Sequence, residues 1–239
     1  FFFQAQDGIR DPLWSRGLGD VYKRQLLREA VNTKTSDIGN EQIDILNTYL
    51  EIVFKWHKKT NIIVSRNQEY FIKREIYDCI DFCIKQEDQT YIDIGTGAGL
   101  PGVLMAILKP GSYVKLLDKR DKIIRFLSHL NASLKLKNIE IIHDRLETMQ
   151  PQDDIKVALI KNFSNKDISG MKLADRINYV YGYLHKKIGG DFKMVFLTGS
   201  EATRLDSSEV AVVDKLLNCS ARAIDNPFYT QKRFILEVV

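Results

Sequence analysis

Residues 91–102 read YIDIGTGAGLPG, a pattern typical of a buried strand that turns sharply into a helix. The apolar residues at its start favour a strand that is covered on both faces. Gly95, Gly97 and Gly99 permit positive φ angles and let the backbone approach a ligand closely. A helix that opens near Pro101 would offer unpaired N–H groups to polar ligand atoms. The segment therefore predicts a strand–turn–helix unit that can hold a ligand at its turn.

Short apolar runs alternate with helical patterns along most of the chain. The runs expected to form strands cover 90–95, 113–118, 139–143, 156–160 and 192–197. The segments expected to form helices between them cover 101–108, 120–136 and 168–187. Strand–helix alternation implies right-handed crossovers and a doubly wound parallel sheet.

Different patterns flank this alternation. Apolar residues at helical spacing predict two earlier helices, over 40–60 with Asn40 as the N-cap and over 69–85. Another helix is expected near 200–218. The segments ARAID and KRFILEVV then flank a turn at Asn226 and predict an antiparallel hairpin. We thus expect an α/β, Rossmann-like sheet that is mostly parallel, ends in a hairpin and carries N-terminal helices.

The composition is that of an ordinary globular protein, with 239 residues, 44% hydrophobic, 28% charged and a net charge of +4. It excludes collagen-like, mucin-like and wholly disordered proteins. No apolar run approaches the roughly 20 residues that a membrane span needs, so we expect no membrane partner. Three cysteines, two of them Cys79 and Cys83, support neither a disulfide framework nor a zinc site. We therefore expect no metal and a reducing, cytoplasmic setting.

Acidic residues stand at the ends of the first two predicted strands. Asp93 precedes Gly95 by two residues and could accept a hydrogen bond from an ammonium group or a water. Asp118 lies 23 residues beyond Gly95, where a carboxylate can hydrogen-bond both ribose hydroxyls of a nucleoside. The alternative role for Asp118 is to cap the following helix.

The glycine spacing favours S-adenosylmethionine over a dinucleotide. It is Gly-x-Gly-x-Gly and not the Gly-x-Gly-x-x-Gly that accompanies a pyrophosphate. From the residues alone, a methyltransferase is the first interpretation, with a dinucleotide enzyme and another nucleotide-binding module as alternatives.

The segment 93–102 also resembles the cofactor loop of the bacterial 16S ribosomal RNA guanine-N7 methyltransferases, once called glucose-inhibited division protein B. Its Leu-Pro-Gly ending is more specific to that family than the glycines are. The likeness extends to residues 56–62, where the family has Trp-Asn-Lys-x-x-Asn-Leu, and to Arg74 and Asp78, where it has Arg-His-x-x-Asp-Ser. Residues 143–147 resemble its Gly-Arg-Ala-Glu segment. Altogether the likeness spans roughly residues 40–200.

The resemblance implies a class I methyltransferase fold, S-adenosyl-L-methionine as cofactor, and methylation of a guanine N7 in 16S rRNA of the small ribosomal subunit by a monomer. The residues it assigns to the cofactor are Asp93, Gly95, Thr96, Gly97, Gly99, Leu100, Asp118, Arg145, Leu146 and Glu147. Those it assigns to RNA are Lys58, Arg74, Asp78 and Lys161. Guanine N7 carries a lone pair and no proton, so no general base is implied. Arg74 and Lys161 are the candidate substrate contacts.

Four positions depart from the family pattern. Glu75 and Cys79 stand where the family has His and Ser, Lys161 where it has Arg, and Thr198 where it has Lys. Lysine keeps the charge of arginine but loses its planar fork. The cofactor residues are therefore kept better than those expected to face RNA. The alternatives are a non-catalytic nucleotide- or RNA-binding module, or a methyltransferase with another RNA or small-molecule target.

Aromatic residues and histidines near these motifs have two interpretations each. Trp56 and Phe163 could stack on a base, although Trp56 is expected to pack between helix and sheet instead. His57 and His143 are expected to be structural or RNA-contacting rather than general bases.

Residues 1–25, FFFQAQDGIRDPLWSRGLGDVYKRQ, resemble a translated sequencing adapter. A signal peptide would need a basic start and an apolar centre of about 7–15 residues, and the segment has neither. We therefore expect it to be no native part of the protein. The remainder is expected to form a helical region over 26–88 and a Rossmann-like core over 89–239.

Overall fold

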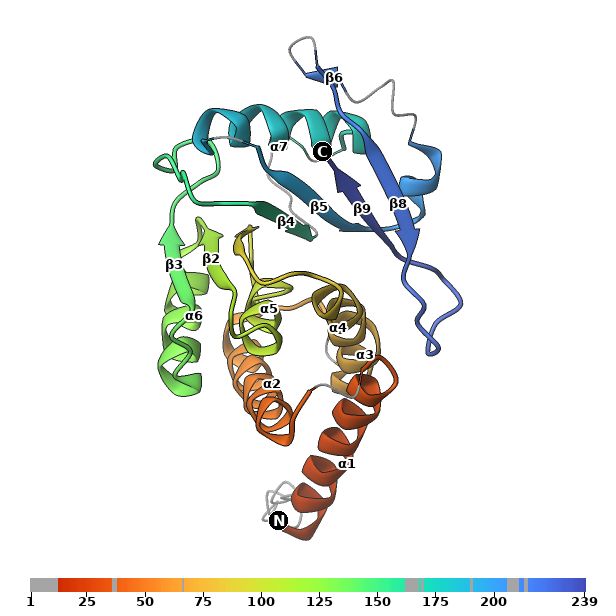
Figure 1. The fold of residues 1–239 in the computed structure, drawn as a ribbon. Helices are drawn as coiled ribbons and strands as arrows, with labels where there is room; N and C mark the ends of the chain where they lie inside the picture. The colour runs from red at the N-terminus through yellow and green to blue at the C-terminus, as the bar shows by residue number, and fades with distance from the viewer. Residues whose placement is uncertain are drawn as a thin grey trace, which may run out of the picture.

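The structure is a computed structural model that describes residues 13–35, 38–65, 67–161, 168, 170–189, 191–205, 211–212 and 215–239. At its centre is a seven-stranded sheet in the order β3-β2-β1-β4-β5-β9-β8 (Figure 1). Its strands are β1 (Thr90–Ile94), β2 (Tyr113–Asp118), β3 (Ile139–His143), β4 (Val157–Lys161), β5 (Lys193–Thr198), β8 (Cys219–Ala223) and β9 (Phe234–Val238). The first five pair in parallel, and β9 is antiparallel to both β5 and β8. The predicted parallel sheet with a terminal hairpin is confirmed.

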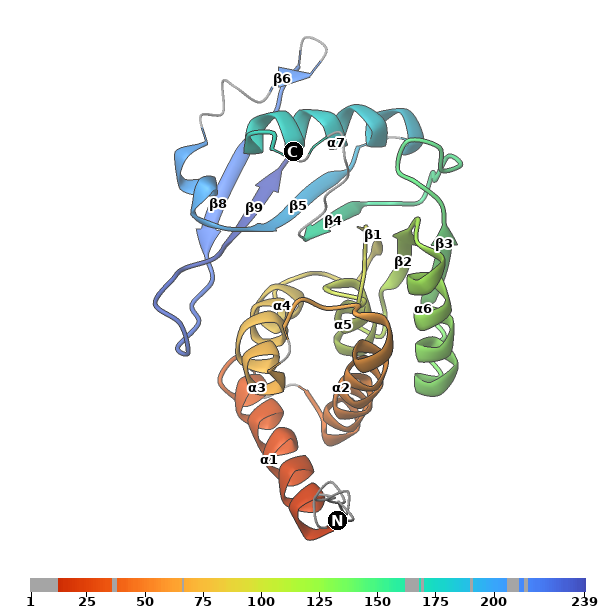
Figure 2. The same ribbon diagram turned by 180° about the vertical axis from the view of Figure 1, so that it is seen from behind.

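Helices cover both faces of this sheet (Figures 1 and 2). They are α1 (Leu13–Asn32), α2 (Asn40–Thr60), α3 (Gln68–Phe71), α4 (Tyr77–Ile84), α5 (Gly102–Leu108), α6 (Asp121–Leu134) and α7 (Leu173–Lys187). Alternate residues of β1 face opposite cores, as a strand requires. Tyr91 packs with α2, α4, α5 and α6, whereas Ile92 and Ile94 pack with α7. A strand buried on both faces explains why the sequence from 91 to 94 is nearly all apolar.

The early helices agree with the prediction except at their details. The helical run from Gln68 to Ile84 is confirmed, and its middle, η1 (Ile72–Ile76), is a π-helix. The prediction that Asn40 caps α2 is wrong. Gly39 is the N-cap, because the Gln42 side chain accepts its backbone N–H at 3.0 Å.

The helix expected near 200–218 is also wrong. The described residues there form a 3₁₀ turn, η2 (Ser200–Arg204), and two short strands, β6 (Ala211–Val212) and β7 (Lys215–Leu216), that pair with each other. Val212, in β6, has the stiff χ1 that favours a strand.

The first 12 residues lie outside the described part of the chain, and residues 13–32 form α1. Leu27 and Ala30, near its end, are fully buried in the core. The adapter interpretation of residues 1–25 rests on the sequence and stays a prediction. Among the described residues, no helix has both the length and the apolarity that crossing a membrane demands.

The loop between β8 and β9 packs against the helical run that ends in α4. The rings of Phe228 and Tyr77 meet edge to face, with their centroids 5.4 Å apart. The Asn226 side chain donates to the Asp78 carboxylate at 2.8 Å. The C-terminal hairpin thus holds the helices that precede the sheet in sequence.

Candidate functional site

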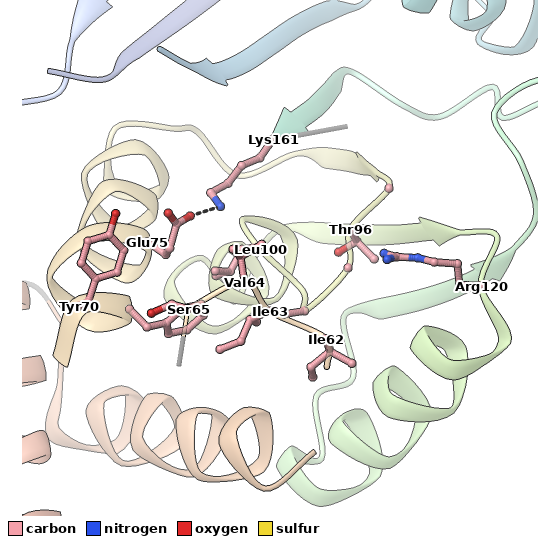
Figure 3. Close-up of a pocket in the computed structure, with 14 residues that line it drawn as sticks. Ile62, Ile63, Val64, Ser65, Tyr70, Glu75, Thr96, Leu100, Arg120 and Lys161 are labelled. Carbon is pink, nitrogen blue, oxygen red and sulfur yellow. Dashed lines mark hydrogen bonds and ion pairs between the residues drawn. The ribbon is translucent and has the colours of Figure 1, made fainter. Parts of the chain in front are cut away.

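A cavity of about 400 Å³, here called the main cavity, lies at the carboxyl ends of the central strands (Figure 3). Its lining residues are Ile62, Ile63, Val64, Ser65, Tyr70, Phe71, Glu75, Gly95, Thr96, Gly97, Ala98, Leu100, Arg120 and Lys161. It is of the size that small-molecule sites have. In the strand order, β1 has β2 on one side and β4 on the other, which makes this edge the topological switch point. Ligands of open α/β sheets bind at such a point.

The turn after β1 depends on glycine for both conformation and space. Gly95, Gly97 and Gly99 have φ angles of 69°, 56° and 89°. A Cβ on Gly99 would lie 2.4 Å from Cγ2 of Val103, far inside contact distance. These residues form the turn that the sequence predicts, and it borders the main cavity.

Asp93 fastens this turn to the start of α5. Its Oδ2 accepts from the Thr96 hydroxyl at 2.7 Å and from the Gly102 N–H at 2.8 Å. Its Oδ1 is buried and has no hydrogen-bond donor among the described residues. Burial raises the pKa of Asp93 to about 6. An ammonium group or a water would satisfy this oxygen, which is the role predicted for Asp93.

Asp118 is fully engaged by its neighbours. Its Oδ1 accepts from the backbone N–H and the Nε of Arg120, each at 3.0 Å. Its Oδ2 accepts from a guanidinium nitrogen of Arg120 at 2.8 Å and from the Gly97 N–H at 3.1 Å. A carboxylate has about four acceptor positions, and all four are filled. Ribose hydroxyls could reach Asp118 only if Arg120 moved aside.

Sequence reasoning missed Arg120, which lines the main cavity beside Thr96 (Figure 3). An arginine two residues after a strand-end aspartate was the available signal. It could also have predicted that Asp118 neutralises a cation. Burial opposes the ionisation of Asp118, but its hydrogen bonds to Arg120 outweigh this and lower the pKa of Asp118.

Charged side chains form the opposite end of the main cavity. In Figure 3 Lys161, from the end of β4, points toward Glu75 of η1, and the two form an ion pair. Glu75 also accepts from Arg233 at 3.0 Å. Burial opposes the ionisation of Glu75, but Lys161 and Arg233 outweigh it and hold its pKa below the usual value. The two departures at positions 75 and 161 are therefore partners in one ion pair.

The other residues predicted to face RNA near this end are buried. Asp78 is fully buried. Besides accepting from Asn226, its carboxylate has the Nε of Arg233 at 3.4 Å from Oδ2. Arg74 is 8% exposed and donates to the Gln231 carbonyl at 3.0 Å. Direct contact of Asp78 with RNA would require the β8–β9 loop to open, whereas Arg74 keeps a small exposed fraction. Lys58, by contrast, is exposed at the end of α2.

Residues 145–147 do not line the main cavity. Leu146 is buried in the core beneath α7, and Glu147 accepts from the Tyr179 hydroxyl at 2.8 Å. Asp144 caps the turn by accepting from the Arg145 N–H at 2.7 Å. The contact that the family resemblance implies between residues 145–147 and the cofactor, at its adenine, stays a prediction.

Among the described residues, the ring contacts of Trp56 are with a helix and not with the sheet: it meets Phe126 of α6 edge to face, with ring centroids 5.7 Å apart. His57 accepts from the Ile63 N–H at 3.3 Å and so helps to shape the segment after α2. His143 lies 3.4 Å from Asp121. Phe163 lies outside the described residues.

In the described part of the chain, the side chains able to ligate a metal are dispersed, and two of the three cysteines are buried. No group of three or more His, Cys, Asp or Glu side chains that could hold an ion occurs there. Cys79 and Cys83 are free and buried. Burial raises the pKa of Cys79 to about 12, so this thiol is protonated at neutral pH.

Sequence comparison finds similarity to one family. A family model described as GidB, rRNA small subunit methyltransferase G, matches residues 42–183. A relative from Pseudomonas syringae pv. syringae (strain B728a), named ribosomal RNA small subunit methyltransferase G, is 36% identical over 135 residues, which are 56% of this chain and 63% of that protein. A relative of the same name from Ruthia magnifica subsp. Calyptogena magnifica is 31% identical over 139 residues, 58% of this chain and 68% of that one. The match to the Pseudomonas relative thus spans less than two thirds of its length.

Structural comparison establishes the fold. The human methyltransferase 10 domain containing protein superposes with a TM-score of 0.53 and 14% identity, covering 80% of this chain and 96% of that one. A SAM dependent methyltransferase from Aquifex aeolicus gives 0.51 and 13%, covering 78% and 97%. With the strand order above, these likenesses show a class I S-adenosylmethionine-dependent methyltransferase fold, as predicted.

Proposed function

This chain belongs to the rRNA small subunit methyltransferase G family, and on that premise we propose that it methylates N7 of a guanine in 16S rRNA. The observation that carries the proposal is that one cavity joins the glycine turn to a charged wall made by η1 and β4. The turn would hold S-adenosylmethionine, and the wall would hold the base.

The residues at the turn fit this cofactor. Gly95, Gly97 and Gly99 would let the backbone follow its methionine part, and the orphaned Oδ1 of Asp93 would accept from an ammonium group directly or through a water. Asp118 would hold the ribose once Arg120 releases it. S-adenosylmethionine, when bound, supplies a methyl group that its sulfonium already activates.

The wall offers both a hydrogen-bond acceptor and a donor to a purine edge. Glu75 is the sole carboxylate among the described residues that line the main cavity. Its charge is balanced by Lys161 and Arg233, so its part would be to orient the base as a hydrogen-bond acceptor. Lys161 keeps Glu75 ionised and offers its ammonium donors to the oxygen on the same purine edge.

No other acid–base group is needed at this site. N7 carries a lone pair and no proton, so the wall has only to orient the base. Correct placement alone can lower a barrier by about 7–11 kcal/mol in favourable cases. The absence of a reactive thiol at Cys79 is consistent with this mechanism.

The alternative is a module that binds nucleotide or RNA without transfer, and the filled acceptor positions of Asp118 favour it. Isothermal titration with S-adenosylmethionine, followed by transfer of a labelled methyl group to small ribosomal subunits, separates the two. We expect saturable binding and labelling at one guanine N7. Binding without transfer to any RNA would support the module, and transfer only to metabolites would indicate a small-molecule enzyme.

A further inference from the structure

A second cavity of about 240 Å³, here called the basic cavity, lies behind the charged wall. Arg74 of η1, Arg176 of α7, Thr198 at the end of β5, and Lys232 and Arg233 before β9 all line it. Four cationic side chains thus converge there, against one carboxylate, Glu201. Nothing in the methyl-transfer mechanism uses this cavity.

The cations of the basic cavity are incompletely neutralised. Glu201 accepts from one guanidinium nitrogen of Arg176 at 2.5 Å, but the Nε of Arg176 is buried without an acceptor among the described residues. Arg74 donates to a backbone carbonyl, not to a carboxylate. Lys232 is exposed at the rim. Because four cationic side chains and one carboxylate line this cavity, an anionic ligand would be stabilised there.

One ion pair joins the basic cavity to the main cavity. Arg233 lines the basic cavity, and it bonds Glu75, which lines the main cavity, at 3.0 Å. A nucleotide whose base lies against Glu75 therefore has its backbone within reach of the neighbouring cations. Arginine forks match the paired oxygens of a phosphate.

We propose that the basic cavity binds a backbone phosphate of the RNA whose guanine enters the main cavity. The assignment rests on the proposed function. It gives the C-terminal hairpin, which lies beyond the segment matched by the family model, a direct part in substrate binding. It also places the departure Thr198 within the phosphate site, where arginines supply the charge.

The test compares Lys232→Ala and Arg176→Ala with Lys186→Ala, which removes the same charge from an exposed position on α7 outside the cavity. Affinity for a 16S rRNA fragment is measured across a series of salt concentrations. Each cavity variant should weaken binding about tenfold and reduce the slope of log K against log salt by about 0.7–0.9. Affinity for S-adenosylmethionine should not change. Slopes equal to that of Lys186→Ala would overturn the proposal.

A second arm separates RNA from free phosphate. Inorganic phosphate should compete with RNA for the wild-type protein and compete less for Arg176→Ala. Saturable phosphate binding that Arg176→Ala abolishes, with an unchanged RNA slope, would assign the cavity to a free anion and overturn the RNA assignment. Loss of slope in a protein that methylates no RNA would instead disprove the proposed function and leave the phosphate site standing.

Discussion

The two ends of the main cavity are built by different means. At the end proposed to hold the cofactor, three glycines with positive φ let the backbone form the surface, and two carboxylates, Asp93 and Asp118, fasten it. At the wall, long charged side chains form the surface, and Glu75, Lys161 and Arg233 hold one another. The first end depends on a local turn, and the second on partners up to 158 residues apart.

Because the two ends are built differently, substitutions at them should affect the protein differently. A backbone turn has little choice of conformation, so a change there alters the shape of the site at once. A buried ion-pair network can lose two partners together and survive, although it does not tolerate losing one. The following variants test that contrast.

The largest loss of stability should come from removing Glu75, the carboxylate that Lys161 and Arg233 share. Glu75→Ala leaves Lys161 and Arg233 buried without their shared carboxylate, and it should lower the free energy of unfolding by about 3–5 kcal/mol. Denaturant titration measures this. Adding Lys161→Met should recover much of the loss, because the lysine is then no longer an unpaired buried charge.

The matched control is Glu69→Ala. Glu69 is half exposed and forms an ion pair with Lys73, which lies one helical turn further along the chain. The substitution should change stability by no more than about 0.5 kcal/mol. A cost below 1 kcal/mol for Glu75→Ala, within the usual range of surface changes, would show that the wall is held by something other than these charges.

Gly99→Ala should break the cofactor end. The positive φ costs about 1 kcal/mol or more, and the overlap with Val103 adds about 1–3 kcal/mol. We expect a loss of about 3 kcal/mol in unfolding experiments, with loss of S-adenosylmethionine binding by calorimetry. Gly182→Ala is the control, since a Cβ there meets nothing within 4 Å on α7. If Gly99→Ala binds cofactor like wild type, the turn is not the binding surface.

The pH dependence of the free energy of unfolding should reveal the raised pKa of Asp93. Its pKa of about 6 lies above the ordinary 3.8, so between pH 4 and 6 the native state holds a proton that the unfolded state has lost. Stability therefore falls as pH rises through this window, by at most about 3 kcal/mol at about 1.4 kcal/mol per unit. The difference in unfolding free energy between wild type and Asp93→Asn, measured at each pH, isolates this effect.

In the same experiment, the difference in unfolding free energy between wild type and Asp118→Asn should change with pH in the opposite direction. The pKa of Asp118 is lowered, so its contribution is present above its unfolded pKa and is lost as pH falls through the folded value. A difference for Asp93→Asn that stays flat from pH 4 to 6 would contradict the buried carboxylate.

The smallest effect concerns Arg120. Because it fills three of the four acceptor positions of Asp118, Arg120→Ala should tighten S-adenosylmethionine binding by about tenfold, or about 1.4 kcal/mol. The backbone bond from residue 120 remains, so two positions open. Calorimetry measures the gain, and Asp118→Asn should weaken binding instead. A weaker affinity for Arg120→Ala would show that the arginine serves the ligand.

The sequence predicted the parts of the site that depend on near neighbours. The turn at 95–99 needs glycine for its own φ angles, and the strands from 90 to 161 are continuous apolar runs, so both could be identified locally. The ion pair between Glu75 and Lys161 could not, because it depends on how η1 lies against β4. Each residue alone looked like a departure from the family, whereas together they form one contact.

The contacts that the C-terminal hairpin makes with η1 and α4 were not predicted, for a related reason. Arg233 and Asn226 read as hairpin residues, and their targets, Glu75 and Asp78, precede them by about 150 positions. The sequence from 200 to 218 misled in another way, because its apolar residues match helical spacing while its valines favour strands.

The place of β9 between β5 and β8 sets an order of assembly during synthesis. Both neighbours are made before it, so on the ribosome β5 remains an open edge until residues 234–238 emerge. Arg233 immediately precedes that strand, and it brings the counter-charge to Glu75 in the same step. The glycine turn, whose fastenings all lie before residue 121, can close much earlier. A chain interrupted before β9 would thus present the glycine turn beside a wall that lacks Arg233.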